Sequence, residues 1–400
     1  MFKKILKSYD YSLIIAIFLL SAFGLVMVYS ASMASAVQRY GVASDYFYQR
    51  QKIFLIGAAV IFVLTALFPY KAMKSNRILA PMVLLSLVGL FALFVFGHLA
   101  GGAQSWFKIG ALSLQPSEFV KLCVIIYLAA VYAKKQAYVN EFNKGVLPPL
   151  AYLVLVSALI AIQPDFGTAM IIVLIAGTIL MSSGMNFKNF AKLIIMGLIL
   201  IAPFLLILKG EIFSTKRVDR FAVMNDPFAT EKTSGFQMAN SYIAIGSGGV
   251  NGLGLGRGVQ KLGYLPEAHT DFIMAVIAEE LGVWGVGFVI ILLAYIVLRG
   301  IRIALKCTDP FGSLLAIGIS SMIGIQTFIN LGGVSGLIPL TGVPLPFVSY
   351  GGSSLIQLAI ATGILANVSM FVNYEEKYRP KKEQIDKSAK QSGSVFQMRT

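Results

Sequence analysis

Long apolar runs alternate with short polar segments along most of this chain. Each run approaches the roughly 20 residues that an α-helix needs to cross a bilayer, and the shorter ones fit a locally thinned membrane. The ten runs are Tyr11–Tyr29, Ile53–Phe68, Ile78–Phe96, Phe119–Ala133, Leu147–Ile162, Thr168–Met181, Phe190–Leu208, Phe272–Leu298, Ser313–Leu331 and Leu355–Val372. The pattern predicts an all-α polytopic membrane protein with ten transmembrane helices, a domain that spans residues 1–373. A soluble protein with buried core helices is the weaker alternative.

The composition supports this class. Hydrophobic residues make up 57% of the chain and charged residues 13%, whereas a soluble domain is about 25% charged. The first run is too long for the core of a cleavable signal peptide. Cys123 lies in a span and Cys307 in an inner loop, so neither a disulfide nor a thiolate metal site is expected.

The distribution of basic residues sets the predicted orientation. With the N-terminus in the cytoplasm, the inner segments carry most of the lysines and arginines, as the positive-inside rule requires. The short outer loops carry only Arg39, Arg50, Lys52 and Lys108. An even number of spans returns the C-terminus to the cytoplasm. The net charge of +15 then reflects topology and anionic lipid rather than nucleic acid.

Three segments between or after the runs stand out. Residues 209–270 form a long extracellular loop between the seventh and eighth helices, with a glycine-rich stretch (246–258) that predicts tight turns rather than a nucleotide site. Residues 332–354 are apolar but rich in proline and glycine, so we expect a non-helical loop that lines a cavity or re-enters the membrane. Residues 374–400 are polar and are expected to be a disordered cytoplasmic tail.

Four carboxylates cluster where the eighth run begins: Glu267, Asp271, Glu279 and Glu280. A charge at membrane depth costs on the order of 3 kcal/mol and suggests a function. Asp271 is either a helix N-cap or a general base. On a continuous helix Glu279 would lie roughly 80° from Asp271 and Glu280 nearly opposite, so Glu279 would extend a polar cavity and Glu280 would pair with a neighbouring helix.

Further polar residues fall on the same predicted outer side. Glu118 and Lys121 are three residues apart and therefore adjacent on a helix, as a structural or functional pair. Asp165 is best explained as a turn or cap residue. Arg217 and Arg220 suit either pyrophosphate or lipid head groups. His269 either positions Asp271 or lies at the membrane interface, and the interface is the favoured alternative.

Together these motifs resemble the SEDS family (FtsW/RodA/SpoVE) of bacterial cell division, elongation and sporulation, and the division branch most closely. The resemblance rests on segments that cover nearly the whole chain except the tail: Gln115-Pro-Ser-Glu118 with Lys121, Gln163-Pro-Asp165, Gly246–Gly258, Tyr264-Leu-Pro-Glu-Ala-His-Thr-Asp-Phe-Ile273, Glu279-Glu-Leu-Gly282, Pro339-Leu-Thr-Gly342 and Pro346-Phe-Val-Ser-Tyr-Gly-Gly-Ser-Ser354.

The resemblance implies an inverting peptidoglycan glycosyltransferase that polymerises lipid II at the outer face of the cell membrane. It implies partnership with a class B penicillin-binding protein and other division proteins. Asp271 is then the catalytic residue. The substrate-binding candidates are Glu118, Lys121, Arg217, Arg220, Lys261, Glu267, Glu279, Ser349 and Tyr350. No His/Cys metal motif is present, although a divalent cation (Mg or Mn) held by carboxylates and pyrophosphate would leave no such motif.

Two other functions remain compatible with the pattern. A lipid II flippase would also use intramembrane carboxylates, but it would favour polar sites at the bilayer midplane in both halves of the chain. A non-catalytic division scaffold would tolerate substitution of Asp271.

Overall fold

The computed structural model describes residues 2–100, 103–109, 112–207, 223–224, 226–230 and 235–378. Arg217 and Arg220 therefore lie outside the described residues, as does the tail beyond residue 378. The helices are α1 (Phe2–Leu6), α2 (Tyr11–Gln38), α3 (Tyr46–Leu67), α4 (Asn76–Phe96), α5 (Pro116–Lys134), α6 (Leu147–Ile162), α7 (Phe166–Ser182), α8 (Phe187–Ile207), α11 (Phe236–Gly248), α12 (Ile273–Lys306), α13 (Pro310–Val334) and α14 (Gly352–Tyr378). Shorter helical turns are η1 (Tyr70–Lys74), η2 (Gln136–Tyr138), η3 (Phe142–Val146) and η4 (Gln260–Leu262).

Each of the ten predicted apolar runs forms one of these helices. Eight helical segments are long and apolar enough to cross a membrane, counting only the part of the chain that the structure describes. Helix α7 is apolar but shorter. The last helix continues to Tyr378, so the tail predicted from residue 374 begins a turn later than expected.

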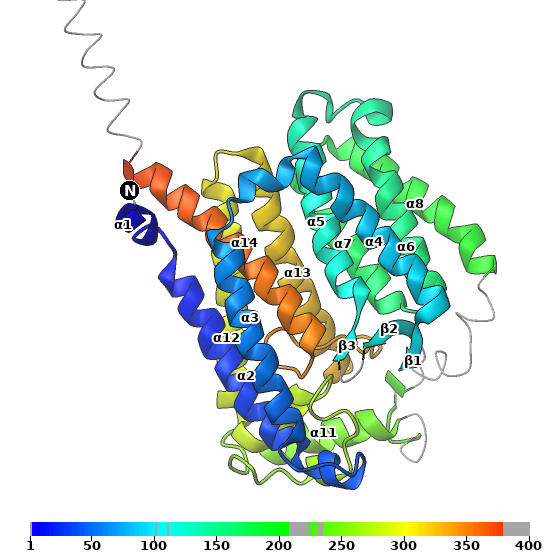
Figure 1. Cartoon of the computed structure of the whole chain (residues 1–400). Helices are drawn as coiled ribbons and strands as arrows, with labels where there is room; N and C mark the ends of the chain where they lie inside the picture. The colour runs from blue at the N-terminus through cyan, green and yellow to red at the C-terminus, as the bar shows by residue number, and fades with distance from the viewer. Residues whose placement is uncertain are drawn as a thin grey trace, which may run out of the picture.

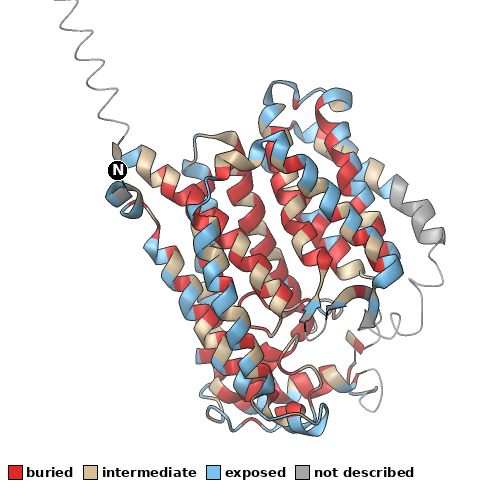
Figure 2. Cartoon of the chain, in the orientation of Figure 1, coloured by how far each residue is buried: buried red, intermediate tan, exposed pale blue. Residues whose placement is uncertain are grey.

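The long helices form one bundle around α13 and α14 (Figure 1). Helix α14 packs on α3, and α13 packs on α5, α7 and α12. Buried residues concentrate in the central helices, whereas α3 and α4 carry many exposed apolar residues on their outer sides (Figure 2). This inside-out exposure fits a protein whose surrounding solvent is lipid.

The all-α prediction is wrong between α4 and α5, where a small sheet connects the two helices. Strands β1 (His98–Ala100), β2 (Ala103–Ile109) and β3 (Leu112–Leu114) pair antiparallel in that order. Only two residues separate each pair of strands, which is the spacing of tight hairpins.

Helix α12 is not the continuous span that its hydropathy predicted. Gly282 has φ 60° and ψ −153° inside the helix and breaks it after nine residues. The prediction failed because the break leaves no mark on the hydropathy: apolar residues continue on both sides. Glu279 and Glu280 consequently lie at the end of the first half of α12, just before a sharp change of direction. The angles predicted between them and Asp271 do not apply, because Asp271 lies before the helix begins at Ile273.

The connection between α13 and α14 is non-helical, as predicted, although it is shorter than the predicted 332–354 because α13 continues to Val334 and α14 begins at Gly352. Its backbone reaches the middle of α2, where a Cβ atom on Gly24 would come within 2.6 Å of the Phe347 carbonyl oxygen. Val343, Leu345 and Val348 are buried. The loop is therefore enclosed by protein, which is the condition under which irregular backbone is tolerated inside a membrane bundle.

Candidate functional site

Asp271 lies in the turn that leads into α12, two residues before the helix begins at Ile273. Its backbone carbonyl accepts a hydrogen bond from Asn330 Nδ2 at 2.9 Å. Its carboxylate faces Gly342, where a Cβ atom would lie 3.5 Å from Asp271 Oδ2. Gly342 has φ +75°, a left-handed conformation that favours glycine at this turn. The N-cap interpretation is not supported, because the N-cap of α12 is Phe272.

The loop before α14 fixes the backbone next to Asp271. Ser349 Oγ donates to the Thr270 carbonyl at 2.6 Å and accepts from Leu345 N at 2.9 Å. Tyr350 N donates to the His269 carbonyl at 2.9 Å. Ser349 and Tyr350 thus lie beside the proposed base, where both hold the main chain.

His269 is buried rather than interfacial, with 3% of its surface exposed. Its ring lies 4.4 Å from that of Phe47 and 5.7 Å from that of Tyr350, measured between centroids. Burial lowers the pKa of His269 to about 4, because the charged imidazolium loses its hydration. The residue is therefore a neutral packing element at neutral pH.

Glu118 and Lys121 form the predicted pair at the start of α5, with Lys121 Nζ 2.8 Å from Glu118 Oε1. Both side chains are buried. The residue preceding this helix is fixed by α14, since Gln115 N donates to Ser353 Oγ at 3.1 Å. One oxygen of the pair, Glu118 Oε2, is buried and has no hydrogen-bond partner within the described part of the chain.

Asp165 caps α7, as the sequence favoured: Oδ1 accepts from Thr168 N at 3.2 Å. Its other oxygen accepts from Gln115 Nε2 at 3.4 Å, and this links the α7 and α5 motifs. Burial raises the pKa of Asp165, and the nearby Lys121 opposes that shift. The next turn touches the α13–α14 loop, with Gly167 packed against Thr341.

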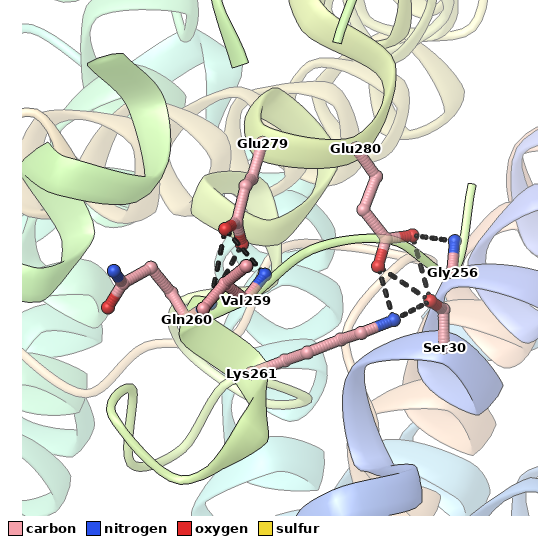
Figure 3. A network of polar contacts seen from close by, with 7 residues as sticks. All are labelled: Ser30, Gly256, Val259, Gln260, Lys261, Glu279 and Glu280. Carbon is pink, nitrogen blue, oxygen red and sulfur yellow. Dashed lines mark hydrogen bonds and ion pairs between the residues drawn. The ribbon is translucent and has the colours of Figure 1, made fainter. Parts of the chain in front are cut away.

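Glu267 lies near the surface. Its Oε1 is 3.3 Å from Arg39 Nη1, and its Oε2 accepts from Thr270 Oγ1 at 3.0 Å. Lys261 and Glu279 lie in a separate polar network around η4 (Figure 3). There the Lys261 ammonium is paired with Glu280.

The motifs thus converge on the N-terminal ends of α5, α7, α12 and α14 and on the loop before α14. Among the described residues, no three His, Cys, Asp or Glu side chains form a potential metal site. Asn330 and Thr341 were missed by the sequence analysis. For Asn330 a signal existed, since an amide inside an apolar helix needs a partner.

The chain is similar to known proteins along almost its whole length. The Cell cycle protein family (FtsW/RodA/SpoVE) matches residues 11–374. The chain is 58% identical to the Probable peptidoglycan glycosyltransferase FtsW of Bacillus subtilis (strain 168), over 98% of each chain. It is 39% identical to Stage V sporulation protein E of the same organism, over 91% of this chain and 98% of that one.

Two solved structures share the fold. RodA of Thermus thermophilus superimposes with a TM-score of 0.65 at 24% identity, over 92% of this chain and 98% of RodA. A chain of the structure described as "Structural coordination of polymerization and crosslinking by a peptidoglycan synthase complex" gives a TM-score of 0.71 at 23% identity, over 91% of this chain and 98% of that one.

Proposed function

Since this chain belongs to the FtsW/RodA/SpoVE family of cell cycle proteins, we propose that it is a peptidoglycan glycosyltransferase that polymerises lipid II during cell division. A relative named FtsW and a relative named for sporulation both align along more than nine-tenths of the chain. Identity is higher to the relative named FtsW than to the sporulation protein. This difference favours the division role.

One observation carries the chemical part of the proposal: distant motifs meet around Asp271. Asn330, Ser349 and Tyr350 donate to the backbone carbonyls of Asp271 and of the two residues before it, through hydrogen bonds of 2.6 to 2.9 Å. A general base must be fixed within reach of the proton that it removes. Asp271 would accept the proton of the sugar hydroxyl while that oxygen attacks the anomeric carbon of the donor.

The same end of the bundle suits an anionic leaving group. The helices α5, α7 and α14 begin close together here, since Gln115 before α5 contacts both Ser353 of α14 and Asp165 at the start of α7. The positive end of a helix dipole favours phosphate. Lys121, with Arg217 and Arg220, would supply positive charge to the departing undecaprenyl pyrophosphate. A single base acting on a good leaving group gives inversion at the anomeric carbon, because retention uses a second carboxylate as nucleophile.

The proposed membrane arrangement has ten spans, with both termini in the cytoplasm and this end of the bundle facing outward. The positive-inside bias supports it, and α7 and α8 supply the two crossings beyond the eight long helical segments. The lipid tails of the substrate would remain in the bilayer while the sugars reach Asp271.

We further propose a class B penicillin-binding protein as partner, together with other division proteins. A structural neighbour comes from a complex that couples polymerization to crosslinking. A Mg or Mn ion would depend on the pyrophosphate for most of its ligands, because the described residues offer no cluster of three metal-binding side chains. Activity measured before and after chelation tests for such an ion.

The deciding experiment incubates the purified protein and its penicillin-binding partner with labelled lipid II. We expect glycan strands from the wild type and none from Asp271→Asn, with an unchanged melting temperature. Asp165→Asn is the matched control: it alters a buried cap at the same end and should retain polymerisation. Strands from Asp271→Asn would refute the base assignment. Accelerated lipid II movement across liposomes without strands would identify a flippase. Neither strands nor lipid II movement in vitro, with cell division supported by Asp271→Asn, would identify a scaffold.

A further inference from the structure

The break in α12 is stabilised by the glycine-rich loop rather than by the helix itself. The carbonyls of Glu279 and Glu280, just before the break, accept hydrogen bonds from Leu253 N and Gly254 N of the loop, each at 2.9 Å. In return, Val283 N donates to the Val250 carbonyl at 3.0 Å. The loop therefore substitutes for one missing helical turn.

Glycine is required for this contact because backbone meets backbone. A Cβ atom on Gly248 would lie 1.9 Å from the Ala278 carbonyl oxygen, and one on Gly252 would lie 2.3 Å from the Glu280 carbonyl oxygen. At Gly258 a Cβ atom would lie 2.8 Å from Glu279 Oε2. The glycine-rich stretch is thus packed tightly on the end of the first half of α12.

Two adjacent carboxylates then hold the far end of the loop (Figure 3). Glu279 accepts from Val259 N at 2.7 Å and from Gln260 N at 3.1 Å. Glu280 accepts from Gly256 N at 2.9 Å and pairs with the Lys261 ammonium. The donors lie between Gly256 and Lys261, in the segment that leads into η4 and in η4 itself.

Helix α2 completes the cluster through Ser30. Its Oγ donates to Glu280 at 2.8 Å and accepts from Lys261 Nζ at 2.7 Å. Lys261 is 2% exposed and Glu280 is fully buried. Two charges buried this deeply must satisfy each other, and removing one partner leaves the other uncompensated.

The Lys261–Glu280 network affects Asp271 because it joins residues on both sides of Asp271 in the sequence. Residues 259–261 lie before Asp271 and residues 279–280 lie after it, so the network joins the two ends of the segment that carries the base. We propose that Lys261 and Glu280 are positioning residues, which close this segment onto α2 and thereby orient Asp271. The proposal rests on the function assigned to Asp271 above, and it gives Lys261 a role other than contact with pyrophosphate.

A charge-removal cycle tests the assignment. Lys261→Met and Glu280→Gln are made singly and together, with the exposed pair Lys306→Met and Glu376→Gln as matched control. Each single variant of the buried pair leaves one buried charge without its partner. We therefore expect kcat to fall roughly 10- to 100-fold with KM nearly unchanged, which is the scale expected when a catalytic group is misplaced. The double variant has no unpaired charge in this pair and should regain most of the lost kcat. The control variants should behave like the wild type.

Amide hydrogen exchange supplies a readout that needs no substrate. We expect faster exchange over residues 253–273 in each single variant and near wild-type protection in the double. A double variant that remains as inactive as Lys261→Met while its amides are protected would overturn the proposal, because Lys261 would then act on the substrate itself. Unchanged exchange in the single variants would also overturn it.

The polymerase function and the positioning role of Lys261 and Glu280 can be refuted separately. Suppose that the wild type makes no glycan strands, while amide exchange is faster in the single variants and near wild-type in the double variant. The polymerase assignment is then wrong, and the coupling of the network to the Asp271 segment stands. If strands form and the exchange pattern does not follow, the positioning role is wrong and the polymerase assignment stands.

Discussion

The substitution Gly282→Ala should be among the most damaging single changes in α12. Gly282 has φ 60° and ψ −153°, a backbone region occupied almost only by glycine. An added Cβ atom would lie 2.3 Å from the Val250 carbonyl oxygen and 2.5 Å from Gly252 N. Both are backbone atoms, so no side-chain rotation can relieve the contact.

The size of the effect follows from two contributions. Holding a non-glycine residue in this conformation costs about 1–3 kcal/mol. If the loop retreats from the methyl group, it gives up the three backbone hydrogen bonds made by Leu253, Gly254 and Val283, each worth about 0.5–1.5 kcal/mol. Together these give a loss of about 3–7 kcal/mol in the free energy of unfolding.

The measurement is unfolding by SDS titration in mixed micelles, compared with Gly287→Ala. Gly287 lies in the same helix, and a Cβ atom there would meet nothing within 4 Å. The control should gain up to about 1 kcal/mol from the better helix propensity of alanine. Equal stability of the two variants would refute the claim that the break at Gly282 is required.

Three further predictions concern the surroundings of the candidate site. Ser349→Ala removes the donor to the Thr270 carbonyl, so unfolding should cost about 1–3 kcal/mol less and kcat should fall; an unchanged kcat would contradict the role of this loop. Glu118→Gln and Lys121→Met each break a buried pair and should destabilise by about 3–5 kcal/mol, whereas the double variant should be milder in the same SDS titration. His269 has a folded pKa of about 4 against an ordinary 6.5, so the unfolded state binds the proton first and stability should fall as the pH drops from 6.5 to 4, by up to about 3 kcal/mol. His269→Phe should flatten that profile, and a profile unchanged by the substitution would exclude His269 as its cause.

The elements best predicted from sequence are those set by local rules. The apolar runs became helices because their length and hydropathy leave few alternatives in lipid. The Glu118–Lys121 pair follows from helical spacing alone. Asp165 was identified as a cap from the Pro-Asp-Phe-Gly context, and it caps α7. In each case the partners are at most three residues apart.

The features that sequence did not predict depend on distant partners. The break at Gly282 requires a loop some thirty residues earlier in the chain to pack against it. A hydropathy profile carries no information about such a contact. Glu280 was expected to pair with another helix, and it does contact Ser30 of α2; its main partner, Lys261, had been assigned to substrate instead. The sheet between α4 and α5 was missed because its strands are only three to seven residues long.

The Ser30–Glu280 contact can form only after most of the chain has been synthesised. The two residues are 250 positions apart, and ribosomes add about 5–20 residues per second. Helix α2 therefore waits roughly 10–50 s after its own synthesis before Glu280 emerges. Until then the Ser30 hydroxyl lacks the carboxylate that it binds in the finished bundle, so α2 completes its buried polar contacts only late in synthesis.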